Sequence, residues 1–392
     1  MKIGMFTDSY RPYTSGLVRS LETTASNLLE LGHEVYIFAP HYPRYAEKES
    51  GVFRFVSVPS PRYPEFTIAL PFSLSLRSTV RRIGLDVVHV HSPFPMGQLG
   101  VWCARRSGLP LVFTYHTMYD QYMHYVPFAR GLSRRIVRYY LPAFCNRCDV
   151  VIAPTKIVGD LIGGQLRTRV EVVPTGIETD EFNDADSGWL RRRYGIGGDT
   201  KILLHVGRLG KEKNIGFLLQ AYRQVLQQHP DTCLVFVGDG PERERLKEEA
   251  RRLGLETSVL FTGLLPRCHV IDSYAGADLF VFASVTETQG LVLGEAKAAG
   301  LPAVAVSALG AAEMVNDGVD GYLTPLSLPL FTEKVRLLLE NEQLRRSMAE
   351  RAKLEADKIS ALNMARKLAE VYETAAECRS CTPQPLKKRS AR

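Results

Sequence analysis

The clearest fold signal in this sequence is Leu279-Phe-Val-Phe-Ala-Ser-Val-Thr-Glu-Thr-Gln-Gly-Leu-Val-Leu-Gly-Glu295. Its first five residues form a short apolar run, which is typical of a buried strand, and residues 291–299 have the pattern of a helix. Two carboxylates, Glu287 and Glu295, flank the start of that helix. Free N–H groups at a helix N-terminus bind phosphate, and carboxylates accept hydrogen bonds from sugar hydroxyls. The stretch therefore predicts a strand, a turn and a helix that together suit a phosphorylated sugar ligand.

The same alternation of strand and helix extends through the whole chain. In the first half, strands are expected at residues 2–7, 35–39, 86–90, 111–115, 150–153 and 170–173. In the second half, they are expected at residues 201–207, 233–238, 259–262, 279–283 and 303–306. Most are separated by segments long enough for helices, which indicates parallel strands joined by helical crossovers. We predict the α/β class, with two doubly wound, Rossmann-like sheets.

The length of 392 residues exceeds what one hydrophobic core usually organises, so two domains are expected. The first spans residues 1–176 and the second spans residues 177–362. A C-terminal helix over residues 363–377 is expected to pack back on the first domain, and residues 378–392 to form a disordered basic tail. Ligands of doubly wound sheets bind beyond the carboxyl ends of the strands, so the expected site is a cleft between the domains.

The composition excludes several classes of protein. No run of about 18 apolar residues occurs and the N-terminus begins a strand, so we expect a cytoplasmic protein without a membrane span. Seven scattered cysteines suit reduced thiols, and the pairs Cys145/Cys148 and Cys378/Cys381 are too far apart to favour a shared zinc site. The motifs of α/β-hydrolases, zinc proteases, P-loop NTPases and EF-hands are absent.

Positive charge is concentrated in the first half of the chain. Residues 1–176 contain 20 Lys and Arg against 12 Asp and Glu, whereas residues 177–392 contain 29 against 30. A basic half suits an anionic partner, either a membrane surface or a nucleic acid. Nucleic acid is disfavoured, because the charges accompany an apolar helix face and no recognised nucleic-acid-binding motif occurs.

A basic amphipathic helix is expected over residues 130–143. At about 100° per residue, its arginines share one side and its apolar side chains the other. The arginines are Arg130, Arg134, Arg135 and Arg138, and the apolar residues are Leu132, Ile136, Tyr139, Tyr140 and Ala143. Such a helix can rest on anionic lipid headgroups, although helices that cover sheets are often equally amphipathic. We expect peripheral contact with the inner face of the cell membrane.

Three loops after predicted strands carry candidate ligand-binding groups. Gly16 precedes a helix and lets the backbone approach a ligand, although a Ser-Gly pair there is usually a cap. Arg208 and Lys213 share one loop. The planar guanidinium of Arg208 and the compact ammonium charge of Lys213 suit a diphosphate, unless this is simply a solvated, charged loop. His116 lies in an aromatic-rich loop that suits an acceptor pocket, formed with Tyr115, Tyr119 and Asp120.

Two further features carry a structural interpretation. His89 and His91 alternate along a strand without other ligand partners, and we interpret both as structural. Glu295 has the apolar neighbours Leu293 and Ala296, which indicates a buried segment in which an unpaired charge would be costly.

Taken together, the motifs resemble those of the family-four retaining glycosyltransferases, which have the GT-B fold. The resemblance covers residues 1–376 and rests on Gly16, His116, Gly207-Arg208-(x4)-Lys213-Asn214, Phe261-Thr-Gly263 and Glu287-(x7)-Glu295. It implies hexose transfer from a nucleotide-sugar donor held mainly by the second domain to an acceptor bound by the first. It also implies no cofactor, no metal for donor binding and no enzymic nucleophile.

The resemblance further implies a role for each motif. Arg208 and Lys213 neutralise the diphosphate, Glu287 contacts the transferred hexose and Glu295 contacts the ribose. The backbone donors to phosphate or sugar are Gly290, Leu291 and Val292. Gly16 closes on the diphosphate from the first domain, and His116 lies near the sugar and the reacting centre.

A closer resemblance is to the bacterial enzymes that glucosylate diacylglycerol. It rests on Thr7-Asp-Ser-Tyr-Arg-Pro-Tyr-Thr-Ser-Gly16, His91-Ser-Pro-Phe94, Thr114-Tyr-His-Thr-Met-Tyr-Asp120, His124-Tyr125 and Thr286-Glu-Thr-Gln-Gly-Leu291. It implies UDP-glucose as the donor and 1,2-diacylglycerol as the acceptor. GDP-mannose or another donor, and a phosphatidylinositol, polyprenyl-linked or soluble acceptor, stay open as alternatives. A nucleotide-sugar epimerase of the same architecture is disfavoured by the spacing of the two glutamates.

Two segments depart from the family pattern. Ser307-Ala-Leu-Gly-Ala-Ala-Glu-Met314 lacks the common Gly-Gly-x-x-Glu form but keeps Gly310 and Glu313. Leu264-Leu-Pro-Arg-Cys-His-Val270 replaces the commoner acidic residues after the Phe-Thr-Gly strand. We expect recognition of the nucleotide base to depend on backbone contacts.

Overall fold

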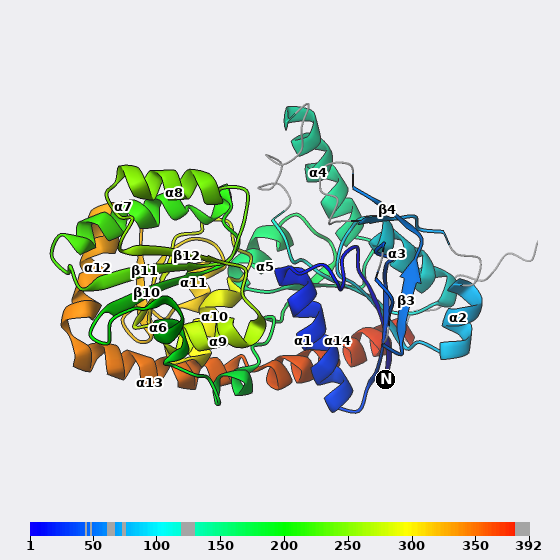
Figure 1. The fold of residues 1–392 in the computed structure, drawn as a ribbon. Helices are drawn as coiled ribbons and strands as arrows, with labels where there is room; N and C mark the ends of the chain where they lie inside the picture. The colour runs from blue at the N-terminus through cyan, green and yellow to red at the C-terminus, as the bar shows by residue number, and fades with distance from the viewer. Residues whose placement is uncertain (44, 48, 61–66, 73–75, 119–129, 381–392) are drawn as a thin grey trace, which may run out of the picture. The chain divides into compact units, whose positions relative to one another are not determined.

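The computed structural model describes residues 1–392 except 44, 48, 61–66, 73–75, 119–129 and 381–392. The chain forms two compact units, each with its own sheet (Figure 1). Unit 1 contains residues 1–153, 159–173 and 364–392, and unit 2 contains residues 154–158 and 174–363.

Unit 1 is built on a seven-stranded parallel sheet in the order β3-β2-β1-β6-β7-β8-β9. Its strands are β1 (Lys2–Phe6), β2 (Glu34–Pro40), β3 (Val52–Phe55), β6 (Val87–Val90), β7 (Leu111–Thr114), β8 (Val150–Ala153) and β9 (Arg169–Val172). An antiparallel ribbon joins β4 (Ser57–Pro59) to β5 (Thr67–Ala69). The helices are α1 (Gly16–Glu30), α2 (Leu76–Ile83), α3 (Pro95–Ser107), α4 (Arg130–Cys145), α5 (Lys156–Gly163) and α14 (Ala361–Ser380), the last two shared in sequence with unit 2.

Helix α14 supplies part of the core of unit 1. Ala365, Leu368 and Tyr372 are buried in the same cluster as Ile3 and Met5 of β1. The helix continues to Ser380, so residues 378–380 are helical and do not belong to the predicted tail. No helix breaker occurs before Pro383, which explains the longer helix. Residues 381–392 lie outside the described part of the chain.

Unit 2 is built on a six-stranded parallel sheet in the order β12-β11-β10-β13-β14-β15. Its strands are β10 (Lys201–Val206), β11 (Thr232–Val237), β12 (Val259–Gly263), β13 (Leu279–Phe282), β14 (Ala303–Val306) and β15 (Gly321–Thr324). The helices are η2 (Thr179–Phe182), α6 (Trp189–Tyr194), η3 (Lys211–Lys213), α7 (Ile215–Leu226), α8 (Arg243–Arg252), α9 (Arg267–Ala275), α10 (Leu291–Ala298), α11 (Ala311–Met314), α12 (Leu328–Glu340) and α13 (Glu342–Lys358). Figure 1 shows α7 and α8 on one face of this sheet and α6, α9 and α10 on the other, and a buried apolar cluster fills each side.

Both sheets confirm the predicted doubly wound α/β class. In each sheet the first strand is internal, and the strand order reverses beside it, between β1 and β6 in unit 1 and between β10 and β13 in unit 2. Ligands of such sheets bind outside the carboxyl ends of the strands at this reversal. The loops after β10 and β13 therefore hold the first residues to consider in unit 2.

Within the described residues, no helix has both the length and the apolar character needed to cross a lipid bilayer.

Candidate functional site

Two neighbouring loops of unit 2 bring Lys213 and Glu287 together. Lys213 ends η3 after β10, and the left-handed Asn214, with φ of 54°, then starts α7. Glu287 lies in the turn between β13 and α10. The Lys213 ammonium donates a hydrogen bond to Glu287 Oε1, and their side chains are only 17% and 15% exposed. The pair is therefore largely shielded from water and lies where the strand order reverses.

Glu287 carries a full negative charge at neutral pH. Burial by itself would raise the pKa of this carboxyl. The positive charge of Lys213 and hydrogen bonds from Lys213 and Ser284 outweigh burial, so the pKa lies below its ordinary value. An ionised carboxylate only accepts hydrogen bonds, so Glu287 suits hydroxyl donors of a ligand and does not supply a proton.

His205 is a buried residue of this region that the sequence interpretation missed. It lies on β10 with no exposed surface, and its Nδ1 is 3.1 Å from the Val281 carbonyl oxygen. Burial lowers its pKa to about 4, so the ring is neutral at neutral pH. A carbonyl only accepts, so Nδ1 carries the proton and Nε2 is left as an acceptor without a partner among the described residues. His205 is the second last residue of β10, and the sequence pattern did not distinguish it from an ordinary core residue.

Polar contacts with other segments of unit 2 fix the position of the turn that carries Glu287. Thr155 Oγ1 donates to the Thr288 carbonyl at 2.8 Å. The buried Gln289 side chain pairs with both backbone groups of Thr175, at 2.8 Å and 2.9 Å. Gly310 N–H donates to the Glu287 carbonyl at 3.0 Å, and a Cβ on Gly310 would lie 2.1 Å from the Thr288 oxygen. Only glycine fits at residue 310 without a backbone shift.

The segment around Gly310 and Glu313, one of the two departures from the family pattern, thus has a structural role. The Glu313 carboxylate accepts hydrogen bonds from the backbone N–H groups of Lys156, at 2.8 Å, and of Ile157. These amides begin α5, so Glu313 caps that helix.

Helix α10 starts directly after this turn. Gly290 has φ of 86°, a left-handed value that favours glycine, and Leu291 and Val292 follow as the first helical residues. The backbone N–H groups at the start of α10 therefore follow directly after the turn that carries Glu287. Arg208 lies on the same loop as Lys213 and is exposed to solvent.

Glu295 lies one turn further along α10 and is held by two donors from α9. Arg267 Nη1 donates to Oε1 at 2.6 Å, and the Tyr274 hydroxyl donates to Oε2 at 2.9 Å. The expectation of a buried segment holds, since the Glu295 side chain is 12% exposed. The charge of Glu295 is paired, as the cost of burying a lone carboxylate requires.

Unit 1 has its own group of polar side chains at the carboxyl ends of β1, β6 and β7. His116 Nε2 is 3.0 Å from His91 Nδ1, and burial lowers the pKa of His116 to about 4 and that of His91 well below its usual value. This contact places His91 beside His116, and the structural interpretation of His91 stays a prediction. His89 does fit that prediction, because it bridges Tyr372 and Thr114 at 2.7 Å on each side.

The other predicted residues of unit 1 differ in how far the structure describes them. Gly16 is exposed at the start of α1, where Ser15 caps the helix. Tyr115 is 6% exposed and packs edge-on against Phe113 in the core. Tyr119 and Asp120 lie outside the described residues.

Helix α4 forms over the segment in which we predicted a basic face. Arg138 is exposed. Tyr139, which we predicted to lie on the apolar side of the helix, is also exposed, at 67%. The side chains of Arg130, Arg134 and Arg135 lie outside the described part of the structure.

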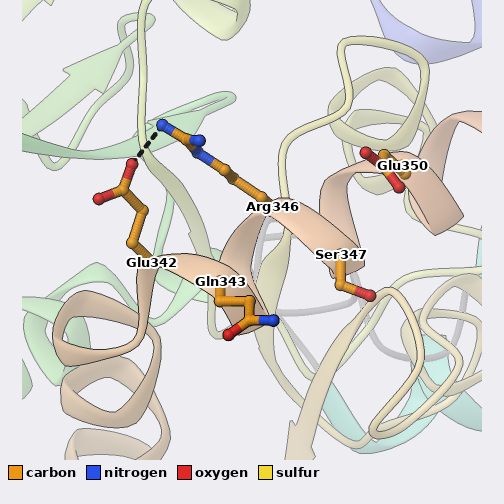
Figure 2. A pocket seen from close by; sticks show the side chains of 5 residues that line it. All are labelled: Glu342, Gln343, Arg346, Ser347 and Glu350. Carbon is orange, nitrogen blue, oxygen red and sulfur yellow. Dashed lines mark ion pairs between the residues drawn. The ribbon is translucent and has the colours of Figure 1, made fainter.

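One surface hollow of unit 2 is lined by none of these residues. Figure 2 shows it along α13, lined by Glu342, Gln343, Arg346, Ser347 and Glu350. Arg346 and Glu342 form an exposed ion pair at 2.5 Å. Exposed side chains of a single helix do not make a ligand site, and none of the predicted residues contributes to it. Among the described residues, no three His, Cys, Asp or Glu side chains gather as metal ligands.

Comparison with solved structures defines the fold. Anabaena HepE, solved in complex with UDP-glucose, aligns with a TM-score of 0.76 at 21% identity, covering 95% of this chain and 100% of that one. Sucrose-phosphate synthase from Thermosynechococcus elongatus aligns with a TM-score of 0.78 at 19% identity, covering 96% and 99%. The predicted GT-B fold is confirmed.

Sequence comparison then gives the family. Residues 14–181 match the model described as Glycosyltransferase Family 4, and residues 188–355 match that of Glycosyl transferases group 1. The α-monoglucosyldiacylglycerol synthase of Streptococcus pneumoniae is 36% identical over 316 residues, covering 78% of this chain and 71% of that protein. The enzyme of the same name from Acholeplasma laidlawii is 31% identical over 318 residues, covering 78% and 80%. The chain belongs to glycosyltransferase family 4, which confirms the prediction of a hexosyltransferase.

Proposed function

We propose that this enzyme transfers glucose from UDP-glucose to a lipid acceptor such as 1,2-diacylglycerol, with retention of configuration at the sugar. The observation that carries the proposal is the shielded Lys213–Glu287 pair beside the start of α10. The names of the relatives from Streptococcus pneumoniae and Acholeplasma laidlawii support glucose and diacylglycerol. The UDP-glucose bound in HepE supports the donor.

In this proposal, unit 2 holds the donor by charge and hydrogen bonds. Lys213 has three N–H donors, one of which contacts Glu287, and in this proposal its ammonium also donates to the diphosphate. Arg208 and the first amides of α10, at Gly290, Leu291 and Val292, donate to the same group. Glu287 accepts hydrogen bonds from the hexose, and Glu295 accepts them from the ribose.

These groups also account for the chemistry that we propose. As the glycosidic bond breaks, negative charge grows on the diphosphate, and fixed donors beside it lower the barrier. The leaving phosphate accepts the proton of the acceptor hydroxyl, so no side chain acts as a nucleophile. Positive side chains and helix amides supply the neutralising charge, so the proposal needs no metal. The roles of Gly16 and His116 toward the donor stay predictions.

The acceptor and the membrane form the second part of the proposal. A lipid acceptor has to be reached at a bilayer surface, and a peripheral protein with a basic helix can bind anionic headgroups there. The exposed Arg138 and Tyr139 of α4 support such contact at the inner face of the cell membrane.

A matrix of substrates tests the proposal. The purified chain is given UDP-glucose, UDP-galactose or GDP-mannose, each with diacylglycerol, phosphatidylinositol or polyprenyl phosphate in vesicles. We expect one product, glucosyldiacylglycerol, identified by mass spectrometry. Mannose transfer would favour the alternative suggested by the GDP-mannose-dependent α-mannosyltransferase of Corynebacterium glutamicum, which is 29% identical over 333 residues. A lack of transfer to any of the three lipids would contradict the lipid assignment.

A further inference from the structure

Arg267 lies between two carboxylates of unit 2. It is the first residue of α9, and its guanidinium donates from Nε at 2.9 Å and from Nη2 at 2.7 Å to Glu181 Oε2. Its third nitrogen, Nη1, donates to Glu295 Oε1 at 2.6 Å. All three nitrogens of the planar group are therefore used, which a lysine ammonium does not match in geometry.

Tyr274, on the same helix, holds the other oxygen of Glu295. Its hydroxyl donates to Glu295 Oε2 at 2.9 Å, and the residue is 1% exposed. Burial raises the pKa of Tyr274 well above its usual value, so the hydroxyl keeps its proton. Glu295 thus receives one hydrogen bond on each oxygen from α9, and the orientation of its carboxylate is set.

This arrangement leaves Glu295 able to bind a ligand. Each carboxylate oxygen has about two acceptor positions, and one on each is used by Arg267 or Tyr274. Two acceptor positions are left, which is the number that a vicinal diol with two hydroxyl donors requires. A diol is a rigid, directional ligand, so the orientation of the carboxylate determines whether both bonds form.

Residue 267 belongs to the segment that departs from the acidic pattern common in the family. An acidic side chain at this position would place a third negative charge beside Glu181 and Glu295. Arg267 neutralises the two instead, and the nearby charge of Glu295 raises the pKa of Arg267 against the effect of burial.

We propose that Arg267 is a positioning residue for the donor nucleotide, acting through Glu295. The inference rests on the proposed function, in which Glu295 accepts hydrogen bonds from the ribose diol. Arg267 touches no reacting atom in this scheme. Its loss weakens binding of the nucleotide and leaves the chemical step nearly unchanged.

The test compares UDP with 2′,3′-dideoxy-UDP, which lacks the diol, by isothermal titration calorimetry. The wild type should bind UDP more tightly, and Arg267→Met should lose about tenfold in affinity for UDP but little for the analogue. The KM for UDP-glucose should rise by a similar factor, with kcat within about twofold. Arg267→Lys should restore part of the preference for UDP.

Arg245→Met is the matched control. Arg245 also pairs with two glutamates, Glu242 at 2.5 Å and Glu249 at 2.9 Å, but on α8 and away from Glu295. It should bind both nucleotides as the wild type does. If Arg267→Met does not fold, Arg267→Lys carries the test, because its single ammonium should also narrow the preference for UDP.

Two results separate failure of the inference from failure of the proposed function. The variants of Arg267 overturn the inference if they keep the wild-type preference for UDP, or if they lose affinity for both nucleotides equally. In either case the role of Arg267 is only to join α9 to α10. If the wild type binds GDP and not UDP, the proposed donor is wrong. A comparison of GDP with 2′,3′-dideoxy-GDP then tests Arg267 in the same way. A wild type that binds neither nucleotide overturns both.

Discussion

The ion pair between Lys213 and Glu287 determines where both side chains lie in this site. Each charge is compensated by the other, and the hydrogen bonds place both side chains before any ligand arrives. The motif in the sequence predicted that both residues bind the donor. It did not predict that they bind each other, because the contact joins loops that are 74 residues apart.

Lys213→Met should abolish sugar transfer and destabilise unit 2 by about 3 kcal/mol, because it leaves a buried carboxylate without its partner. The pKa of Glu287 in the folded state lies below its ordinary value of 4.5. The ion pair therefore stabilises the fold fully at a pH above 4.5, and this stabilisation is lost as the pH falls through the pKa of the folded state. The gap between wild type and variant should therefore shrink in acid. Urea denaturation at pH 7 and pH 4 measures it, and normal turnover by the variant would contradict the site.

His205→Gln should make unit 2 less sensitive to mild acid. Burial holds the pKa of His205 at about 4, so below about 6.5 the unfolded chain binds a proton that the folded chain excludes. At pH 5.5 this costs about 1.4 kcal/mol, and glutamine avoids it. Trp189 fluorescence in a Trp102→Phe background reports on unit 2 during denaturation. Equal losses in both proteins between pH 7 and pH 5.5 would show that His205 is not held neutral.

At the scale of elements, the turn between β13 and α10 is positioned by parts of the chain that are distant in sequence. Thr155, Gln289 and Gly310 make the contacts that fix this turn, and no pattern in the sequence predicted these contacts. A close backbone approach leaves no pattern in a single chain. For the same reason, the contact between Arg267 and Glu295 was not predicted, although the segment that contains Arg267 stood out from the family pattern.

Gly310→Ala should lower kcat/KM for sugar transfer by about tenfold or more, because a Cβ at this position displaces the turn that carries Glu287. Gly198→Ala is the control, since nothing lies within 4 Å of a Cβ at that glycine. Both variants should keep the circular dichroism spectrum of the wild type. Equal kinetics in the two variants would mean that the turn tolerates the shift.

Helix α4 should bind anionic vesicles through its arginines. Arg134→Gln combined with Arg135→Gln should reduce binding to vesicles that contain phosphatidylglycerol, and added salt should weaken binding of the wild type. Arg351→Gln, an exposed change on α13, is the control for loss of charge. Vesicle sedimentation checks the prediction, and equal partitioning of all three proteins would remove α4 as the contact.

At the scale of the whole molecule, local patterns were sufficient for the fold class. Alternating apolar runs and helical spacing predicted the central strands of both sheets, such as β10 and β13. Short edge elements, including β3 and β15, were missed because they bury few side chains and lack a clear period. Strand order was also beyond reach, because it depends on pairing between distant segments.

The reaction itself is the central claim, and the anomeric configuration of the product tests it most directly. The enzyme is given UDP-glucose labelled with ¹³C at C1 together with diacylglycerol vesicles, and the anomeric coupling constant of the product is measured by NMR. We predict an α-glucoside, which keeps the configuration of the donor. A β-glucoside, or label recovered only as free glucose, would contradict retaining transfer to the lipid.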